Sequence, residues 1–560
     1  MSKDIKEDNI NSEQEEHEKF LKLMANPQFF NEIISLLKSR TSLIYLTCSE
    51  EKRMLSYFTH LTIARGYKTF VWDCHRGLYE LISGEKEEIS TEDVTDTAVI
   101  LDKIIEQSTI AIQNAQSMMN SGVAGYIYIL LDFHRFIDDA TPDIERRLKR
   151  ISQLESMVSV VVTAPHYVST PALDNEFSLL DFPYPNKEEI SIELDSIVDR
   201  VSNKQGKLPN LKKEVKENRD TIIQAVNGLT CKEIQKAFSK SLVINRKFDI
   251  PTILREKQQI IKKHEVLEFY EPEITLNDVG GLGEMVSWLL SRKNDFTQKA
   301  RDFNIPFPKG ILAIGISGCG KSLMAKATSS LFDLPLLRLD FGKLFQSYVG
   351  SSEAKIREMI KICEACSPCI LWIDEVEKGL SGLKSSGQTD GGTTSRVIGT
   401  LLTWMQEKKS PIFMFCTAND HLQIPPEFMR RFDEVFFVDL PNMAERIHIY
   451  KVLLRKYERD PEKYKLDLIS ISNKSDGYSG SEIEKSINEA IHICFNDGFR
   501  DITTNDIINS LGSFVPLCKM KESEFSDMRE WAKASCKFAN SKLDVNYKTC
   551  PNSKYENLDL

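Results

Sequence analysis

The stretch Ile311-Leu-Ala-Ile-Gly315-Ile-Ser-Gly-Cys-Gly-Lys321-Ser322 decides the fold of this 560-residue chain. Its first four residues are apolar and predict a buried strand, and the next eight follow the pattern G-x4-G-K-[ST]. Leu323–Leu331 continues with helix-forming Leu, Met and Ala. A strand, a glycine loop and a helix in this order form a phosphate-binding loop, because backbone N–H groups and the helix N-terminus then face one centre. The sequence therefore predicts an α/β fold built around this loop.

We expect the glycine loop to hold the phosphates of a nucleotide. Lys321 would reach the terminal phosphates, and the Ser322 hydroxyl would coordinate Mg²⁺. None of the residues between the glycines is proline, so every one of them keeps its backbone N–H. The expected nucleotide-binding residues of this segment are Gly315, Ile316, Ser317, Gly318, Cys319, Gly320, Lys321, Ser322 and Leu323.

Two further strand ends carry residues that would complete this chemistry. The apolar run Ile370–Ile373 ends in Asp374 and Glu375. A carboxylate at a strand tip beside the phosphate loop can bind Mg²⁺, which we assign to Asp374, and Glu375 would orient and deprotonate the attacking water. Phe413–Cys416 predicts another strand, and the amide of Asn419 behind it would position the water or sense the γ-phosphate. The alternative for Asn419 is that it only caps a turn.

Composition narrows the class of protein. The chain has 72 basic and 82 acidic residues, a net charge of −10, which argues against a surface built to bind nucleic acid. No apolar run approaches the roughly 18 residues of a membrane span. Cys363, Cys366 and Cys369 have the spacing of an iron–sulfur motif, but its fourth position falls on Ile373 inside a strand. We therefore interpret them as buried, reduced thiols, which indicate a cytosol-like compartment.

The landmarks that follow residue 270 together resemble the AAA+ ATPase module of the P-loop NTPases. They are Asp278-Val-Gly-Gly281, Pro308-Lys-Gly310, the phosphate loop, Asp374-Glu375, Thr417-Ala-Asn419 and Gly477-Tyr-Ser-Gly-Ser-Glu482. The resemblance implies a parallel-sheet core with a C-terminal helical lid, ATP and Mg²⁺ as cofactors, and assembly of identical chains into a hexameric ring. It also implies that Asp278, Val279 and Gly280 lie near the adenine, and that Gly480 and Ser481 of the lid close over the nucleotide.

Two further segments bear on what such a ring would act upon. Tyr348-Val349-Gly350 resembles the aromatic-hydrophobic-glycine triplet with which ring-forming AAA unfoldases grip a polypeptide client in the central pore. Local packing of the Tyr348 ring under a loop is the alternative. The chain departs from the family pattern where Arg430 and Arg431 are adjacent, since two residues usually separate these arginines. Either guanidinium could reach the γ-phosphate of a neighbouring subunit, and slow or partner-dependent hydrolysis is an open consequence.

The N-terminal half repeats the same order of signals without the catalytic residues. Tyr128–Asp132 aligns with Ile370–Asp374, and Val160–Ala164 aligns with Met414–Ala418. At the place of the phosphate loop, Thr47–Arg53 has no glycine and contains two carboxylates, which would repel phosphate. We interpret this half as a degenerate AAA-like α/β domain that cannot hydrolyse ATP. Two unrelated α/β domains are the alternative.

These signals divide the chain into an acidic tail (1–19), a degenerate AAA-like domain (20–265), an ATPase core (270–440), a helical lid (441–515) and a C-terminal helix with a polar tail (516–560). We expect an exposed connection over Asn203–Arg219 and a closing helix over Glu522–Ala539. Thr230-x-x-Glu233 and Ser479-x-x-Glu482 predict helix capping boxes. Together with Trp72-Asp-Cys-His-Arg-Gly77, Val515-Pro-Leu517 and Trp531, this arrangement resembles the ycf-forty-six family of AAA proteins of algal plastids and cyanobacteria. The resemblance implies a bacterial cytosol or a plastid stroma as the compartment.

We therefore expect a Mg²⁺-dependent ATPase that forms a ring of identical subunits and remodels or threads a protein client, without membrane attachment. The alternative is an ATP-binding switch or scaffold with slow hydrolysis, which the adjacent Arg430 and Arg431 favour. A nucleic-acid translocase is a third hypothesis, which the net charge of −10 disfavours. The sequence does not identify the client or the number of subunits.

Overall fold

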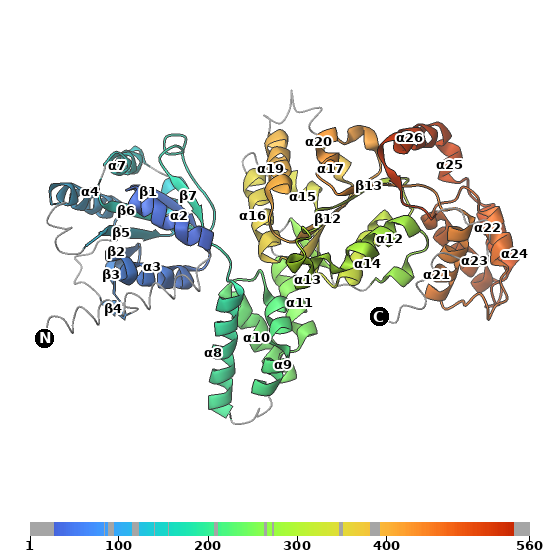
Figure 1. Ribbon diagram of the computed structural model, residues 1–560, viewed down its shortest axis with the longest axis horizontal. Helices are drawn as coiled ribbons and strands as arrows, with labels where there is room; N and C mark the ends of the chain where they lie inside the picture. The colour runs from blue at the N-terminus through green and yellow to red at the C-terminus, as the bar shows by residue number, and fades with distance from the viewer. Residues whose placement is uncertain are drawn as a thin grey trace. The chain divides into compact units, whose positions relative to one another are not determined.

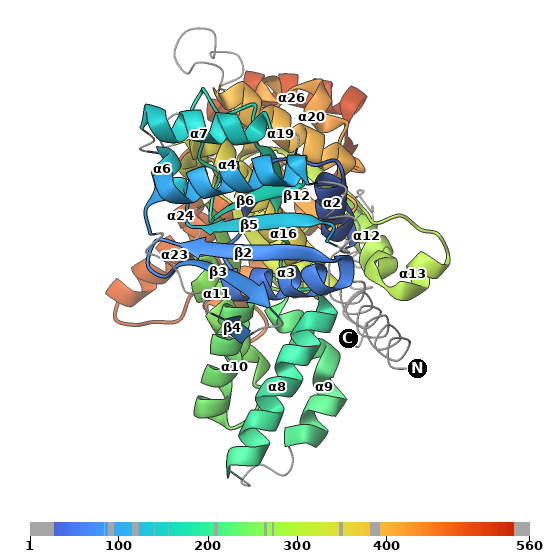
Figure 2. The ribbon, with the colours of Figure 1, turned by 90° about the vertical axis from the view of Figure 1, so that its left-hand side faces the viewer.

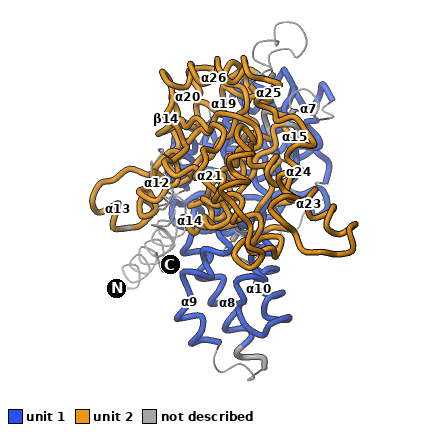
Figure 3. Tube along the Cα trace, turned by 90° about the vertical axis from the view of Figure 1, so that its right-hand side faces the viewer, with its two compact units in different colours: residues 1–257 blue, residues 258–560 orange. Residues whose placement is uncertain are grey.

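The chain folds as two compact units, residues 1–257 and residues 258–560 (Figure 3). The structure is a computed structural model. It describes residues 27–82, 85–87, 95–114, 123–138, 141–154, 156–205, 211–262, 266–270, 274–345, 351–380 and 393–541.

The described part of the first unit contains one seven-stranded sheet in the order β4-β3-β2-β5-β6-β1-β7. The strands are β1 (Leu43–Thr47), β2 (Tyr67–Asp73), β3 (Gly77–Ile82), β4 (Glu85–Glu87), β5 (Gly125–Leu131), β6 (Val158–Ala164) and β7 (Ser178–Asp181). The five neighbouring strands β2, β5, β6, β1 and β7 pair in parallel. Beyond β2, the strands β3 and β4 extend the sheet with antiparallel pairing. All five residues of β1 are buried, as expected for a strand covered on both faces.

Helices cover both faces of this sheet (Figure 2). They are α2 (Pro27–Lys38), α3 (Glu51–Arg65), α4 (Thr97–Gln113), α6 (His134–Asp138) and α7 (Pro142–Ser152). Alternate residues of β1 enter two separate cores. Leu43 and Tyr45 pack with α4 and α7, whereas Ile44 and Leu46 pack with α2 and α3.

Four helices follow the first sheet: α8 (Lys187–Gln205), α9 (Leu211–Val226), α10 (Cys231–Asn245) and α11 (Ile250–Ile261). The predicted capping box at Thr230 and Glu233 is confirmed at the start of α10. The expected exposed connection over Asn203–Arg219 is wrong for its described residues, because α8 extends to Gln205 and α9 begins at Leu211, with Leu211 and Val215 buried. Residues 206–210 of this segment lie outside the described residues. Leu211 and Val215 are four residues apart, so they lie on the same face of the helix and bury it, although the rest of this segment is polar and basic.

The described part of the second unit contains another seven-stranded sheet, in the order β14-β13-β9-β12-β11-β10-β8. Its strands β12 and β13 are labelled in Figure 1. The strands are β8 (Leu267–Tyr270), β9 (Gly310–Gly315), β10 (Leu336–Leu339), β11 (Cys369–Ile373), β12 (Ile412–Ala418), β13 (Glu434–Val438) and β14 (Lys537–Phe538). All neighbours pair in parallel except β8, which pairs antiparallel with β10. Cys363, Cys366 and Cys369 are buried thiols, as expected.

The helices of the second unit surround its sheet and then form a separate bundle. Those around the sheet are α12 (Gly283–Arg292), α13 (Gln298–Asp302), α14 (Lys321–Phe332), α15 (Phe341–Phe345), α16 (Ser351–Ala365), α17 (Val376–Leu380), α19 (Thr393–Glu407) and α20 (Pro426–Met429), and the 3-10 helix η1 (Leu276–Asp278) precedes them. The bundle, here named the lid, consists of α21 (Met443–Lys456), α22 (Leu468–Lys474), α23 (Gly480–Asn496) and α24 (Thr504–Leu511). It has its own hydrophobic core, and the predicted capping box at Ser479 and Glu482 is confirmed.

After the lid, α25 (Leu517–Met520) and α26 (Glu522–Ser535) lead back to the sheet. The expected helix over Glu522–Ala539 is wrong in its last residues, because α26 ends at Ser535 and β14 follows. The Phe538 ring packs edge-on against Phe437 of β13, with 5.3 Å between ring centroids, and the N–H of Ala539 donates to the Phe437 carbonyl. The strand thereby pairs an edge of β13 that a longer helix would leave exposed.

The two sheets share the order of their five parallel strands. In the first unit the order is β7-β1-β6-β5-β2, and in the second it is β13-β9-β12-β11-β10, so the strands occur in the same sequence along both halves of the chain. The expected second copy of the α/β core is therefore present in the topology. In both sheets the chain crosses from β1 or β9 over two strand positions to β2 or β10, and it then returns through the strands between them.

The strand register changes one of the expected equivalences. Thr163 lies opposite Leu131, whereas Ile373 lies opposite Cys416, the residue before Thr417. If the two threonines are matched, Asp132 takes the place of Glu375 rather than that of Asp374. The backbone agrees, since Asp132 and Glu375 both have positive φ angles, of 52° and 51°.

Candidate nucleotide-binding site

A pocket of about 350 Å³ lies in the second unit between the ends of its parallel strands and the lid. Of the expected site residues, it is lined by Asp278, Val279, Gly280, Ser317, Gly318, Cys319, Gly320, Lys321, Ser322, Leu323, Asp374, Glu375, Asn419, Gly480 and Ser481. The remaining lining residues are Leu282, Thr417, Asp439, Pro441, Glu445, Ile449, Val452, Leu453, Glu484 and Asn540. Parallel strands end on the same side of a sheet, so residues far apart in sequence meet at this edge.

The glycine loop turns sharply between β9 and α14. Gly315 has φ of 151°, and a Cβ there would lie 2.1 Å from the carbonyl oxygen of Val438 on the adjacent strand. Gly318 has φ of 78° and faces the Ser479 and Ser481 side chains of the lid. A side chain at either position would meet both a steric clash and an unfavourable backbone conformation. Gly315 and the buried Ile316 hold the loop against the sheet and do not line the pocket themselves.

Lys321 is the buried cation of the site. Its ammonium donates hydrogen bonds of 2.8 Å to the carbonyl oxygens of Gly315 and Ile316, inside the loop that it follows. The side chain is only 6% exposed, and burial lowers the pKa of the ammonium to about 8. A phosphate group in the pocket would supply the negative charge that favours the charged form of this lysine.

The oxygen atoms of Ser322 and Asp374 meet at the mouth of the loop. The Ser322 hydroxyl donates to Asp374 Oδ1 over 2.9 Å, and the Thr417 hydroxyl donates to the same oxygen over 2.6 Å. A hydroxyl and a carboxylate in this arrangement fit Mg²⁺, which takes oxygen ligands and completes its shell with phosphate and water. Among the described residues no cluster of three or more His, Cys, Asp or Glu side chains could hold a metal by itself. The site fits a magnesium ion that arrives with a nucleotide.

Glu375 and Asn419 lie together beside these groups. The Asn419 amide donates to Glu375 Oε1 over 3.3 Å, and Lys378 forms an ion pair with the same carboxylate. The backbone N–H of Glu375 donates to Thr417 Oγ1 over 3.0 Å, which ties the turn after β11 to the end of β12. This arrangement places a carboxylate, oriented by an amide, next to the expected metal ligand Asp374.

The lid contacts the glycine loop directly. The N–H of Ser481, in the first turn of α23, donates to the Gly318 carbonyl over 3.0 Å, and the Ser481 hydroxyl reaches the same oxygen over 3.3 Å. On the other side, Gly280 packs so closely against Ile449 of α21 that a Cβ there would lie 2.8 Å from the Ile449 Cα atom. The pocket is thus closed by both the loop after η1 and the lid.

Sequence reasoning missed the residues that join these parts behind the pocket. Buried Glu445 accepts hydrogen bonds from the backbone N–H groups of Leu282 and Ser541 and from the Asn540 amide. The Asn540 amide oxygen also accepts the N–H of Asp439, and Arg529 donates to both carboxylate oxygens of Asp439, with its Nη2 to Oδ1 and its Nε to Oδ2. The pattern Asn442-x-x-Glu445, a capping box, was a signal for Glu445, but no local pattern indicated Asn540.

Some expected residues lie elsewhere. Arg430 and Arg431 follow α20 and do not line the pocket of their own chain. Tyr348, Val349 and Gly350 lie outside the described residues.

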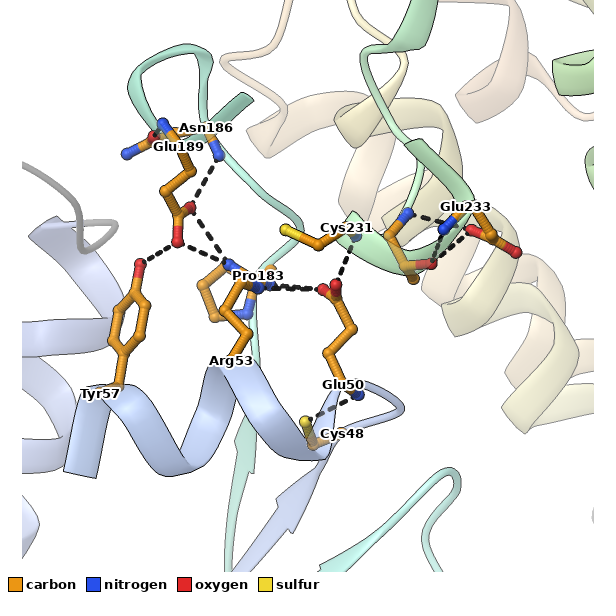
Figure 4. A network of polar contacts seen from close by, with 10 residues as sticks. Cys48, Glu50, Arg53, Tyr57, Pro183, Asn186, Glu189, Cys231 and Glu233 are labelled. Carbon is orange, nitrogen blue, oxygen red and sulfur yellow. Dashed lines mark hydrogen bonds and ion pairs between the residues drawn. The ribbon is translucent and has the colours of Figure 1, made fainter. Parts of the chain in front are cut away.

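The corresponding place in the first unit has no glycine loop (Figure 4). Only Cys48–Glu50 separates β1 from α3, whereas Ile316–Gly320 separates β9 from α14. Arg53 in the first turn of α3 forms ion pairs with Glu50 over 2.7 Å and with Glu189 of α8 over 3.1 Å, and all three side chains are less than 10% exposed.

The same network also reaches the helices that follow the first sheet. The Tyr57 hydroxyl donates to Glu189 Oε1 over 2.8 Å, and the N–H of Cys231, at the start of α10, donates to the Glu50 carboxylate over 2.6 Å (Figure 4). In the second unit, the N–H of Ser481, one residue further into α23, donates to the Gly318 carbonyl of the glycine loop. The first unit therefore joins its core to its helices with its own charged side chains.

Three family models match consecutive parts of the chain. The model of the ATPase family associated with various cellular activities (AAA) matches residues 311–440. The N-terminal domain of SpoVK-like AAA ATPases matches residues 29–182, and their second domain matches residues 188–264. The fold and the pocket thus define an AAA ATPase domain preceded by two SpoVK-like domains.

Relatives match over most of the chain. The "Uncharacterized AAA domain-containing protein ycf46" of Gracilaria tenuistipitata var. liui is 37% identical over 513 residues, which are 90% of this chain and 98% of that protein. The protein of the same name from Guillardia theta is 39% identical over 416 residues, 73% of this chain and 79% of that protein. This chain belongs to the ycf46 family of AAA domain-containing proteins. The crystal structure of the FIGL-1 AAA domain is 21% identical and covers 50% of this chain and 96% of its own, with a TM-score of 0.40.

ATP binding should weaken as the pH rises through the pKa of Lys321. Because this pKa is lowered to about 8 in the free protein, most of the ammonium is charged at pH 7 and most is neutral at pH 9. If bound phosphate keeps the lysine charged, the Kd for Mg·ATP should rise about tenfold across this range. Calorimetry at pH 8.5 in two buffers of different ionisation enthalpy should show proton uptake on binding. A pH-independent Kd without proton uptake would contradict the placement of Lys321.

Arg53→Met should strongly destabilise the first unit. The substitution leaves the buried carboxylates of Glu50 and Glu189 without their cation, which should cost about 3–5 kcal/mol of unfolding free energy. The loss of unfolding free energy is measured by urea unfolding, monitored by pulsed hydrogen exchange in peptides that cover β1 and α10. Arg147→Met is the matched control, because Arg147 of the same unit pairs with two carboxylates, Asp102 and Asp143, that are both exposed. Its midpoint should stay near that of the unmodified protein. Equal midpoints for the two variants would contradict the role of the Arg53 network.

Proposed function

We propose that this protein is a Mg²⁺-dependent ATPase that works as a ring of identical subunits and remodels or threads a protein client. The observation that carries the hydrolysis part is the convergence of Lys321, Ser322, Asp374, Glu375 and Asn419 in one pocket of about 350 Å³. These residues come from three separate segments, and each is of the type that phosphoryl transfer to water requires.

In the proposed mechanism, Lys321 and the backbone of the glycine loop bind the β- and γ-phosphates. Ser322 and Asp374 would hold Mg²⁺, which would neutralise charge on the phosphate oxygens. Glu375 accepts a proton from the attacking water, and Asn419 holds the Glu375 carboxylate in place through the 3.3 Å hydrogen bond. The lid excludes water from the pocket, since Ser481 binds the Gly318 carbonyl of the loop.

Several features support a ring and a protein client. Because Arg430 and Arg431 do not line the pocket of their own chain, either would act on nucleotide only in a neighbouring copy. The triplet Tyr348-Val349-Gly350 resembles the client-gripping segment of AAA unfoldases, and the net charge of −10 disfavours nucleic acid as the client. A hexamer is the proposed assembly.

The compartment is part of the proposal. All cysteines among the described residues are free thiols, which fits a reducing compartment such as a bacterial cytosol or a plastid stroma. Among the described residues, no helix is both long enough and apolar enough to cross a membrane.

A second candidate function is an ATP-dependent switch or scaffold with slow hydrolysis. The ion pair between Lys378 and Glu375 favours it, because the lysine occupies the carboxylate that would otherwise contact the attacking water. The adjacent arginines favour it as well. The dependence of turnover on protein concentration separates the two functions. A steep rise as subunits assemble supports the ring motor, whereas a low rate that does not change with concentration supports the switch.

Glu375→Gln should reduce ATP turnover at least 100-fold and leave ATP affinity within about threefold, since the amide keeps the size of the side chain but cannot accept the proton. Steady-state phosphate release and binding of a fluorescent ATP analogue measure the two quantities. Glu427→Gln, an exposed position on α20, is the control and should leave both unchanged. Unaltered turnover in a folded Glu375→Gln protein would overturn the assignment.

A further inference from the structure

A row of side chains crosses the edge of the second sheet beside the expected metal site. Arg338 of β10 lies directly opposite Glu268 of β8 in the antiparallel register and directly opposite Trp372 of β11 in the parallel register. Directly opposite residues of neighbouring strands share one face of a sheet. Asp374 follows Trp372 by two residues, so it continues the same face at the strand end.

Arg338 lies between two carboxylates. Its Nη1 is 3.3 Å from Glu268 Oε2, and its Nη2 is 3.8 Å from Asp374 Oδ2. The guanidinium also stacks over the Trp372 ring at 5.1 Å from the ring centroid. The contact with Glu268 is a hydrogen bond, whereas the contact with Asp374 is only an ion pair. The arginine is therefore anchored at the edge strand and held short of the metal site.

The two oxygens of Asp374 have different neighbours. Oδ1 accepts the hydroxyl groups of Ser322 and Thr417 on the side of the nucleotide pocket, and Oδ2 faces Arg338. A cavity of about 480 Å³ is lined by Arg338, Asp374 and Lys378, among others, so the guanidinium has room to move toward the carboxylate. A guanidinium that binds both carboxylate oxygens would compete with Mg²⁺ for them.

Glu268 is well suited to restrain the arginine. It accepts a hydrogen bond of 2.9 Å from Lys343 and one of 3.2 Å from the Tyr270 hydroxyl, in addition to the one from Arg338. The hydrogen bond from Lys343 lowers the pKa of the Glu268 carboxyl, with a further contribution from the charge of Arg338. Glu268 is therefore a fixed negative charge. It lies on β8, the edge strand of the described sheet, which pairs with β10.

We propose that Glu268 is a positioning residue that holds Arg338 away from Asp374 and thereby sets the affinity of the site for Mg²⁺. The proposal rests on the proposed function, since it concerns the same metal-binding carboxylate. It also gives β8 a role. This strand begins three residues after the segment matched by the second SpoVK-like domain, so any displacement of β8 from the sheet would release Arg338 onto Asp374.

The test measures Mg²⁺ dependence of nucleotide binding with the full chain. A fluorescent ATP analogue is titrated at fixed Mg²⁺ concentrations and also in excess chelator, and the Mg²⁺ concentration for half-maximal tightening is compared. Glu268→Gln should raise this concentration about tenfold without changing binding in chelator. Arg338→Met should not raise it, and the double variant should behave like Arg338→Met, because the competing guanidinium is gone.

Controls separate this role from simple destabilisation. Glu434→Gln removes an ion pair with Lys537 at the opposite edge of the same sheet and should leave the Mg²⁺ dependence unchanged. Glu268→Asp keeps the charge but shortens its reach and should cause a smaller rise, which provides a second measurement if Glu268→Gln does not fold. An unchanged Mg²⁺ dependence in Glu268→Gln, or a double variant as weak as Glu268→Gln, would overturn the inference. Absence of ATP binding by the unmodified protein would instead overturn the proposed function.

Discussion

Asp374 joins three elements of the ATPase core through one carboxylate oxygen. Its Oδ1 accepts the Ser322 hydroxyl from the start of α14 and the Thr417 hydroxyl from the end of β12, while Asp374 itself directly follows β11. These hydrogen bonds are possible only because β11 and β12 are parallel neighbours that end at the same edge of the sheet. The placement of Glu375, of the glycine loop and of Asn419 depends on this junction.

The second constraint is the closure of the pocket from behind. Glu445 receives hydrogen bonds from the loop before α12, from Asn540 and from the backbone of Ser541, so one buried carboxylate links the core, the first helix of the lid and the C-terminal segment. A buried carboxylate is stable when several hydrogen-bond donors compensate its charge. Loss of one donor leaves that charge only partly compensated, which destabilises the folded state. The position of the lid over the nucleotide pocket is therefore coupled to residues at the end of the chain.

The first unit shows what the same topology does without a phosphate loop. Arg53 pairs with Glu50 and Glu189, and Cys231 at the start of α10 binds Glu50. Core and helices are joined here by charged side chains of the chain itself, whereas in the second unit a backbone hydrogen bond joins Ser481 to the glycine loop. The carboxylate at Glu50, expected only to repel phosphate, instead binds the arginine of the next helical turn.

Much of the fold was accessible to sequence reasoning because its signals are local. The strand and loop from Ile311 to Ser322, the strand before Asp374 and the capping boxes at Thr230 and Ser479 each occupy a few consecutive residues. Predictions of secondary structure failed where a few buried residues, or a neighbouring strand edge, decided the local conformation. The polar stretch at the start of α9 is helical because two apolar residues pack, and the closing helix ends early because β13 offers an unpaired edge.

The sequence by itself determined the class of the core. The strand, the glycine loop, the helix and the later strand that ends before Asp374 are each formed by consecutive residues whose types favour one local conformation. Only the tertiary structure decided which residues close and tune the pocket. Asn540 meets Glu445, and Glu268 holds Arg338, across separations of 95 and 70 residues. Such contacts leave no periodic pattern in the sequence, because they follow from strand register and from the return of the chain to the sheet.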